Sequence, residues 1–104
     1  MSETTQPKTP AVALEEFCTT FAEPTRWNII RELTKGQALP VMELARRVGR
    51  TPAMTSKHLA WLRTRGVVVV CYGRLYQMAP AFQPKPGERV LDLGHCIMRL
   101  DAPL

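Results

Sequence analysis

Hydrophobic side chains recur every three or four residues in four successive segments of the chain, which is the pattern of the buried stripe of an α-helix. The four stripes are Leu14, Phe17, Cys18 and Phe21; Trp27, Ile30 and Leu33; Val41, Leu44, Ala45 and Val48; and Thr55, Leu59 and Leu62. The pattern therefore predicts four consecutive helices, of which the third is only about two turns long.

Capping residues and prolines mark where two of these helices begin. Pro24 follows the carboxylate of Glu23, and Pro52 follows the hydroxyl of Thr51, so each pair supplies a cap and a proline in the first helical position. The three later helices each end at a glycine, namely Gly36, Gly49 and Gly66.

Strand patterns follow the last helix. Residues 67–78, VVVVCYGRLYQM, are β-branched and aromatic around a Tyr-Gly-Arg centre, so they predict a two-stranded hairpin. Residues 87–101, GERVLDLGHCIMRLD, fit both a helical and an alternating pattern, but Gly94 costs a helix about 1 kcal/mol relative to alanine. We therefore favour a strand, or a turn and a strand, that covers an apolar surface. The predicted organisation is a flexible tail over 1–10, one domain over 11–79, and a C-terminal segment over 80–104 that packs on the domain or on a dimer interface.

Two short helices joined by a tight glycine turn and followed by a hairpin form the plan of a winged helix-turn-helix. The predicted fold class is therefore mostly α with a small β-hairpin wing. The outer face of the fourth helix carries Ala53, Ser56, Lys57, Ala60 and Arg63. Small residues let a helix approach base edges in a major groove about 12 Å wide, while Ser and Lys side chains bond to bases or phosphates.

Positive charge is concentrated in the same region. The 104 residues carry a net charge of +5, whereas residues 43–74 hold seven Lys and Arg against Glu43 alone, a local net charge of +6. This balance favours an acidic partner, and double-stranded DNA fits it best. The alternative is a winged-helix module for protein–protein contact, with its basic face solvated or set against an acidic protein.

Several classes of protein do not fit the sequence. No apolar run approaches the roughly 20 residues that span a bilayer, and the N-terminus lacks the pattern of a secretory signal, so we expect a soluble, cytoplasmic protein with no membrane partner. Cys18, Cys71 and Cys96 show no Cys-x-x-Cys spacing, which argues against a zinc ribbon and a disulfide-dense scaffold. Gly-rich phosphate loops, paired carboxylate motifs and a Ser/His/Asp order are missing, so we expect no enzyme and no cofactor.

Residues 14–78 resemble the ArsR family of bacterial winged-helix transcriptional regulators. The matching strings are EPTR at the start of the second predicted helix, ELA in the third, SKHLAWLRTRG in the fourth and GRLY in the wing. The resemblance implies a homodimer that binds a near-palindromic operator, with the first helix and the C-terminal segment at the interface. For the direction of control we expect a repressor, and activation stays open as the alternative. A two-fold dimer would place its recognition helices about 34 Å apart, one turn of B-DNA.

The resemblance also implies a set of DNA contacts. By position, the groove-contacting residues are Thr51, Pro52, Ala53, Ser56, Lys57 and His58, the wing contact is Arg74, and the outer-face pattern adds Arg63. Pro52 and Met54 replace residues that are more often polar in the family. Because Pro52 donates no hydrogen bond, base reading depends more on Ser56, Lys57 and contact with thymine methyl groups. For His58 two roles stay open, a bond to phosphate or a half-buried position.

The sequence identifies no effector. Metal sensing would need thiolates or imidazoles at ligand spacing, but many relatives carry Cys-Val-Cys where this chain has Pro40-Val41-Met42. The remaining local donor cluster is Asp92, His95 and Cys96, and we expect no metal site there. A thiol switch between Cys18 and Cys96 is a further option, set against plain packing, because a cysteine on an apolar stripe usually behaves as a small hydrophobe.

Overall fold

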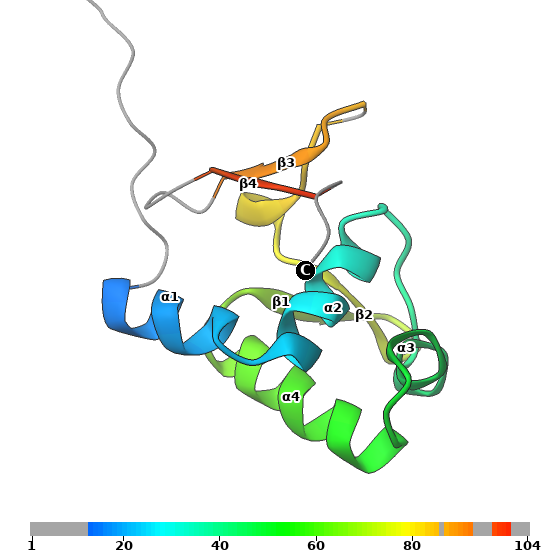
Figure 1. Cartoon of the computed structure of the whole chain (residues 1–104). Helices are drawn as coiled ribbons and strands as arrows, with labels where there is room; N and C mark the ends of the chain where they lie inside the picture. Colours follow the sequence, from blue (N-terminus) through cyan, green and yellow to red (C-terminus); the bar gives the residue numbers. More distant parts are fainter. Residues whose placement is uncertain (1–12, 86, 93–96, 101–104) are drawn as a thin grey trace, which may run out of the picture.

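The structure is a computed structural model that describes residues 13–85, 87–92 and 97–100. Its elements in chain order are α1 (Leu14–Phe21), α2 (Pro24–Leu33), α3 (Val41–Val48), α4 (Pro52–Thr64), β1 (Val68–Cys71), β2 (Leu75–Met78), the 3₁₀ turn η1 (Pro80–Phe82), β3 (Val90–Asp92) and β4 (Ile97–Arg99). All four predicted helices and the predicted hairpin are present. The order is that of a winged helix-turn-helix, with β1 and β2 as the wing (Figure 1).

The local signals for helix ends are confirmed. The carboxylate of Glu23 accepts a hydrogen bond of 2.6 Å from the backbone N–H of Thr25, and the hydroxyl of Thr51 accepts one of 3.2 Å from that of Met54. Each cap satisfies an N–H that has no partner within its helix. Helix α3 ends at Gly49, whose φ of 70° lies in the left-handed region that glycine adopts without strain.

The core lies between α2, α3, α4 and the base of the wing. Its largest fully buried side chains include Ile29 and Ile30 of α2, Leu44 of α3, and Leu59 and Leu62 of α4. The predicted stripes of the second, third and fourth helices thus face the interior or its edge. Burying such side chains is the main favourable contribution to folding in a chain of this size.

Helix α1 differs from the other three. Leu14 is 58% exposed and Cys18 is exposed, whereas Thr20 is buried and Phe21 half-buried at the end of the helix. The side chain of Phe17 lies outside the described part. Among the α1 side chains that the structure describes, the buried and half-buried ones thus lie at the C-terminal end of the helix.

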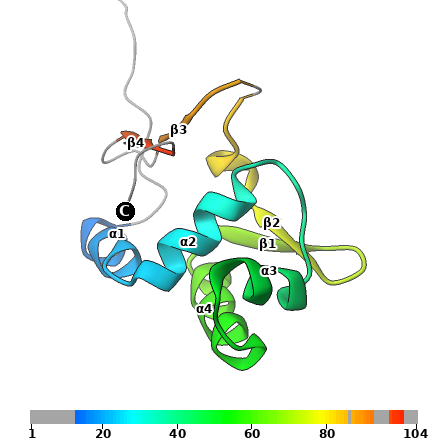
Figure 2. The ribbon, with the colours of Figure 1, turned by 45° about the vertical axis from the view of Figure 1, so that its right-hand side comes forward.

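The wing is tied to the connection between α2 and α3. Strands β1 and β2 pair antiparallel from Val68 opposite Met78 to Cys71 opposite Leu75. Leu39 joins the outer side of β2 through two backbone hydrogen bonds with Tyr76, of 2.9 and 2.7 Å. The tip of the wing is left free and projects beyond α3 (Figure 2).

The C-terminal segment forms a second small hairpin. Strands β3 and β4 pair antiparallel, with Val90 opposite Arg99 and Asp92 opposite Ile97, and both Leu91 and Leu100 are buried. The predicted strand is correct in type, but the segment contains two strands. Figures 1 and 2 place this hairpin and α4 at opposite ends of the molecule, with α2 between them. No helix in the described part is long and apolar enough to cross a membrane.

Candidate nucleic-acid interface

The exposed face of α4 carries most of the predicted DNA contacts. Thr55, Leu59 and Leu62 are fully buried, which turns the opposite side of the helix to solvent. The exposed positions on that helix and its cap are Thr51, Pro52, Ala53, Met54, Ser56, Lys57, Ala60, Arg63 and Thr64. The sequence predicted seven DNA contacts on α4 and its cap, and it placed Ala60 on the same outer face. Of these eight positions, all except His58 are exposed to solvent.

The remaining α4 position, His58, lies apart from this surface. Its side chain is half-buried, and its Nδ1 lies 3.3 Å from Nη1 of Arg26 on α2. Burial lowers the pKa of His58, and the nearby Arg26, Lys57 and Arg50 act in the same direction, while Glu23 opposes them. Of the two roles left open by the sequence, this geometry fits the half-buried one.

Four of the seven cations in residues 43–74 are bound to other groups of the protein. Arg46 and Arg47 both pair with Glu43 on α3, and Arg47 also reaches Glu32 at 3.4 Å. Arg50 donates to the hydroxyl of Thr25 at 3.2 Å. The fourth, Arg65, pairs with Glu16 of α1 at 3.2 Å. These four arginines hold helices together or occupy exposed ion pairs.

Glu43, the carboxylate that pairs with both Arg46 and Arg47, has a strongly lowered pKa. Hydrogen bonds from Arg46 and then Arg47 lower the pKa of Glu43 to about 2. The carboxylate therefore stays charged at any physiological pH, and it keeps two arginines of α3 occupied.

The other three cations of the segment are unpaired. The side chains of Lys57, Arg63 and Arg74 are exposed and make no hydrogen bond or ion pair within the part of the chain that the structure describes. Lys57 and Arg63 belong to α4, and Arg74 lies at the tip of the wing. The cations that are free to meet an external anion are thus the three that the sequence assigned to DNA.

The wing tip has two further properties. Arg74 has a φ of +60° and is the one non-glycine residue of the described chain with a positive φ. Tyr72, two residues earlier, has a fully exposed side chain, with a relative accessibility of 100%. The sequence interpretation did not single out Tyr72, although an aromatic residue directly before the turn glycine was a visible signal.

The cysteine and metal predictions fall partly outside the described residues. Cys18 is exposed on α1 and Cys71 is half-buried in β1, while His95 and Cys96 lie outside the described part. Among the described residues, no group of three or more His, Cys, Asp and Glu side chains is arranged to hold a metal ion. The Cys18–Cys96 thiol pair stays a prediction.

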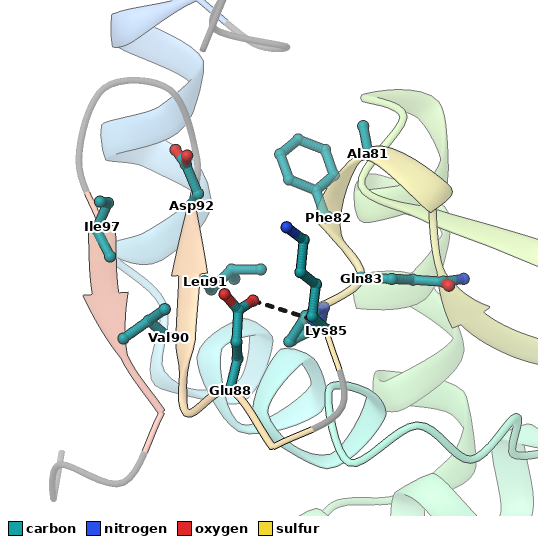
Figure 3. A pocket seen from close by; sticks show the side chains of 10 residues that line it. Ala81, Phe82, Gln83, Lys85, Glu88, Val90, Leu91, Asp92 and Ile97 are labelled. Atoms are coloured by element: carbon teal, nitrogen blue, oxygen red, sulfur yellow. Dashed lines mark hydrogen bonds between the residues drawn. The ribbon is translucent and has the colours of Figure 1, made fainter. Parts of the chain in front are cut away.

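A cavity of about 300 Å³ lies between η1 and the C-terminal hairpin (Figure 3). Phe82 and Leu91 are buried at its walls, and the backbone N–H of Lys85 donates to the Glu88 carboxylate at 3.0 Å. The cavity belongs to the end of the molecule opposite α4, so it is separate from the exposed cationic surface.

Comparisons with known proteins agree with the fold. The family described as bacterial regulatory protein, arsR family, matches residues 23–69, from the cap of α2 into β1. The NMR structure of the cadmium metal-sensor CMTR from Mycobacterium tuberculosis matches with 37% sequence identity and a TM-score of 0.56, covering 65% of this chain and 73% of that one. A search of curated proteins gives no match.

Proposed function

This chain belongs to the ArsR family of bacterial regulatory proteins, and from that premise we propose that it represses transcription by binding a near-palindromic operator as a homodimer. Members of the family are DNA-binding transcriptional regulators, so the chain is a transcription factor and not an enzyme. The proposal concerns the finer points, namely the operator, the dimer, the direction of control and the residues that make contact. It includes a cytoplasmic location, where the chromosome is accessible.

The observation that carries the proposal is the placement of the unpaired cations. Lys57 and Arg63 lie at exposed positions of α4 and Arg74 at the tip of the wing, and in this proposal one duplex meets all three. In this proposal Ser56 and Lys57 read base edges in the major groove, and Arg63 binds the phosphate backbone. Arg74 enters the adjacent minor groove, where narrow A·T tracts attract guanidinium groups.

The small residues at the start of α4 fit the same role. Thr51, Pro52 and Ala53 are exposed and short, so they allow the first turn of the helix to lie deep in the groove. Pro52 donates nothing, and it contributes apolar contact to thymine methyl groups instead. A bulky first turn would hold the helix away from the bases.

The dimer is supported by apolar surface that the single chain leaves exposed. Leu14 on α1 is 58% exposed, and Ile97 on β4 is 65% exposed. Exposed large apolar side chains of this kind gain stability when they are covered, and a two-fold axis would cover the same surface on both subunits. We propose that α1 and the C-terminal hairpin form this interface.

Selection of binding sites from a random duplex pool by the reduced protein tests the proposal. We expect enrichment of an inverted repeat whose half-sites lie about one helical turn apart, with an affinity that falls linearly in log K against log salt. Weak binding without a preferred sequence would contradict the operator assignment and favour the protein–protein alternative. Adding an oxidant to the protein and measuring its binding to the selected site then tests the Cys18–Cys96 pair. A disulfide between these residues would need Cα atoms about 4.4–6.8 Å apart.

A further inference from the structure

A single guanidinium, that of Arg26 near the start of α2, bonds to both α1 and α4. Its Nε donates to the carbonyl oxygen of Thr20 at 2.9 Å, and its Nη2 donates to that of Thr19 at 2.8 Å. Its Nη1 lies 3.3 Å from Nδ1 of His58 on α4. The two carbonyls belong to the last turn of α1, which carries the negative end of the helix dipole, and that of Thr19 also accepts the backbone N–H of Ala22 at 3.4 Å.

The indole of Trp61 completes the connection. The guanidinium carbon of Arg26 lies 4.6 Å from the centre of the Trp61 ring, and that of Arg65 lies 3.3 Å from it. The indole N–H of Trp61 also approaches the hydroxyl of Thr20 at 3.4 Å. Two cations against one electron-rich ring form a stack that joins the end of α1 to the second half of α4.

These contacts help to hold α1 in place, beside the edge-to-face contact of Phe21 on α1 with Trp27 on α2, whose ring centres lie 5.7 Å apart. Thr20 is buried, unlike the other α1 residues whose side chains the structure describes, and it accepts hydrogen bonds from both Arg26 and Trp61. The other charged link from α1 to α4 is the ion pair between Glu16 and Arg65, in which half of the Glu16 side chain is exposed. An exposed pair of this kind contributes little by itself.

We propose that Arg26 is a positioning residue that fixes the recognition helix α4 relative to α1, and thereby sets the separation of the two recognition helices in the dimer. The inference rests on the proposed function, because it requires α1 at the dimer interface and an operator with two half-sites. In such a dimer, any rotation of α4 against α1 changes the distance between the two DNA-reading surfaces. Arg26 opposes that rotation with three donor nitrogens and one ring face.

Lysine cannot take over this role. The planar guanidinium of Arg26 donates from three nitrogens while its carbon lies over the Trp61 ring, whereas an ammonium group is a compact point charge without this fixed arrangement of donors. Arg26→Lys keeps the positive charge but loses the planar arrangement of donors, and Arg26→Met loses both. The two variants therefore separate the effect of the charge from that of the geometry. Arg31→Met serves as the matched control, because Arg31 is half-buried on the same helix and its side chain makes no hydrogen bond or ion pair within the described residues.

The first measurement is hydrogen exchange of the full chain without DNA. We expect the amides of α1 to lose at least about tenfold of their protection in Arg26→Met, since a hydrogen bond from a charged group contributes at least that factor. Amides of α3 and the wing should keep theirs, and Arg31→Met should match the wild type throughout. Unchanged protection of α1 in Arg26→Met would overturn the inference whatever the DNA results.

The second measurement compares duplexes that carry the selected inverted repeat, the same repeat with one or two base pairs added between half-sites, and one half-site alone. We expect Arg26→Met to bind the native repeat at least about tenfold more weakly, because two-site binding is lost when the geometry forbids simultaneous contact. Its half-site affinity should stay within about twofold of the wild type, and its penalty for altered spacing should shrink. Arg26→Lys should behave in the same way despite its retained charge.

The outcomes distinguish this inference from the proposed function. A wild-type protein that shows no preference for the repeat over the half-site contradicts the dimeric operator. A wild type with that preference, combined with an Arg26→Lys variant of identical spacing preference, contradicts the positioning role. If Arg26→Met loses the same factor of affinity for the half-site as for the full repeat, Arg26 has a general structural role, which also overturns the inference.

Discussion

Substitution of Arg74, the arginine at the tip of the wing, tests whether this residue lowers the stability of the fold while it strengthens DNA binding. Arg74 has a φ of +60°, and its side chain makes no hydrogen bond or ion pair within the described residues. A left-handed backbone costs an L-residue about 1–2 kcal/mol, while a glycine loses about 0.5–1 kcal/mol more conformational entropy on folding. The substitution Arg74→Gly should therefore raise the free energy of unfolding by about 0–1.5 kcal/mol, measured by urea denaturation.

The same substitution should weaken DNA binding. A dimer loses two positive charges at the wing tips, and each phosphate contact contributes about 0.9 to the slope of log K against log salt, so the slope should become shallower by about 1.8. The advantage of the wild type over the variant should then be roughly tenfold larger at 50 mM than at 200 mM salt. Fluorescence anisotropy on the selected operator measures both quantities.

Arg74→Ala is the control that separates the two effects. It removes the same charge but keeps a side chain at a positive φ, so it should lose as much affinity as Arg74→Gly without gaining stability. A glycine variant that is less stable than the alanine variant would refute the strain argument. A salt slope equal to that of the wild type in both variants would refute the contact between the wing and DNA.

Three further substitutions test other parts of the structure. Lys57→Glu should abolish operator binding while circular dichroism and the dimer stay unchanged, and normal binding would remove the α4 surface from the interface. Thr55→Val should stabilise the protein by about 1 kcal/mol in urea denaturation, because the Thr55 hydroxyl is buried without a partner among the described residues; a loss of stability would mean that it is bonded. The pKa of Glu43 is lowered to about 2, so its contribution is present above the unfolded pKa near 4.5 and is lost as the pH falls toward 2. Glu43→Gln should accordingly show less acid destabilisation than the wild type between pH 5 and pH 2, and parallel curves would contradict the ion pairs.

Local signals were sufficient to predict the helices and the wing. The caps at Glu23 and Thr51 act within three residues of sequence, and the buried stripes of α2 to α4 follow directly from helical spacing. The C-terminal segment was harder, because its apolar residues fit two periods at once. The second strand pairs through backbone bonds that no side-chain pattern specifies, although Leu91 and Leu100 both turn inward.

The contacts of Arg26 could not be predicted from the sequence. Arg26 and His58 are separated by 32 residues, and nothing about either residue type indicates the other. The pairing of Glu43 with Arg46 and Arg47, by contrast, follows the spacing of three and four residues that favours helical ion pairs, so the sequence contained that signal. A count of charges alone treats all these arginines as equivalent, whereas the structure separates those that are bound to other groups of the protein from those that are free to meet DNA.

That division sets the expected strength of the electrostatic contribution to DNA binding. Residues 43–74 carry a net charge of +6, but within the described structure the side chains of three of the seven cations in this segment are unpaired, which makes six such cations in a dimer. If these six cations, in the grooves and on the backbone, each neutralise one phosphate and no other group does, the salt slope on B-DNA is about −5. If the four paired arginines also turn to DNA, the dimer has fourteen contacts and the slope approaches −13. A measured slope near the smaller value means that the ion pairs on α3 and α1 persist in the complex, and a slope near the larger one means that DNA competes successfully with Glu43 and Glu16 for their partners.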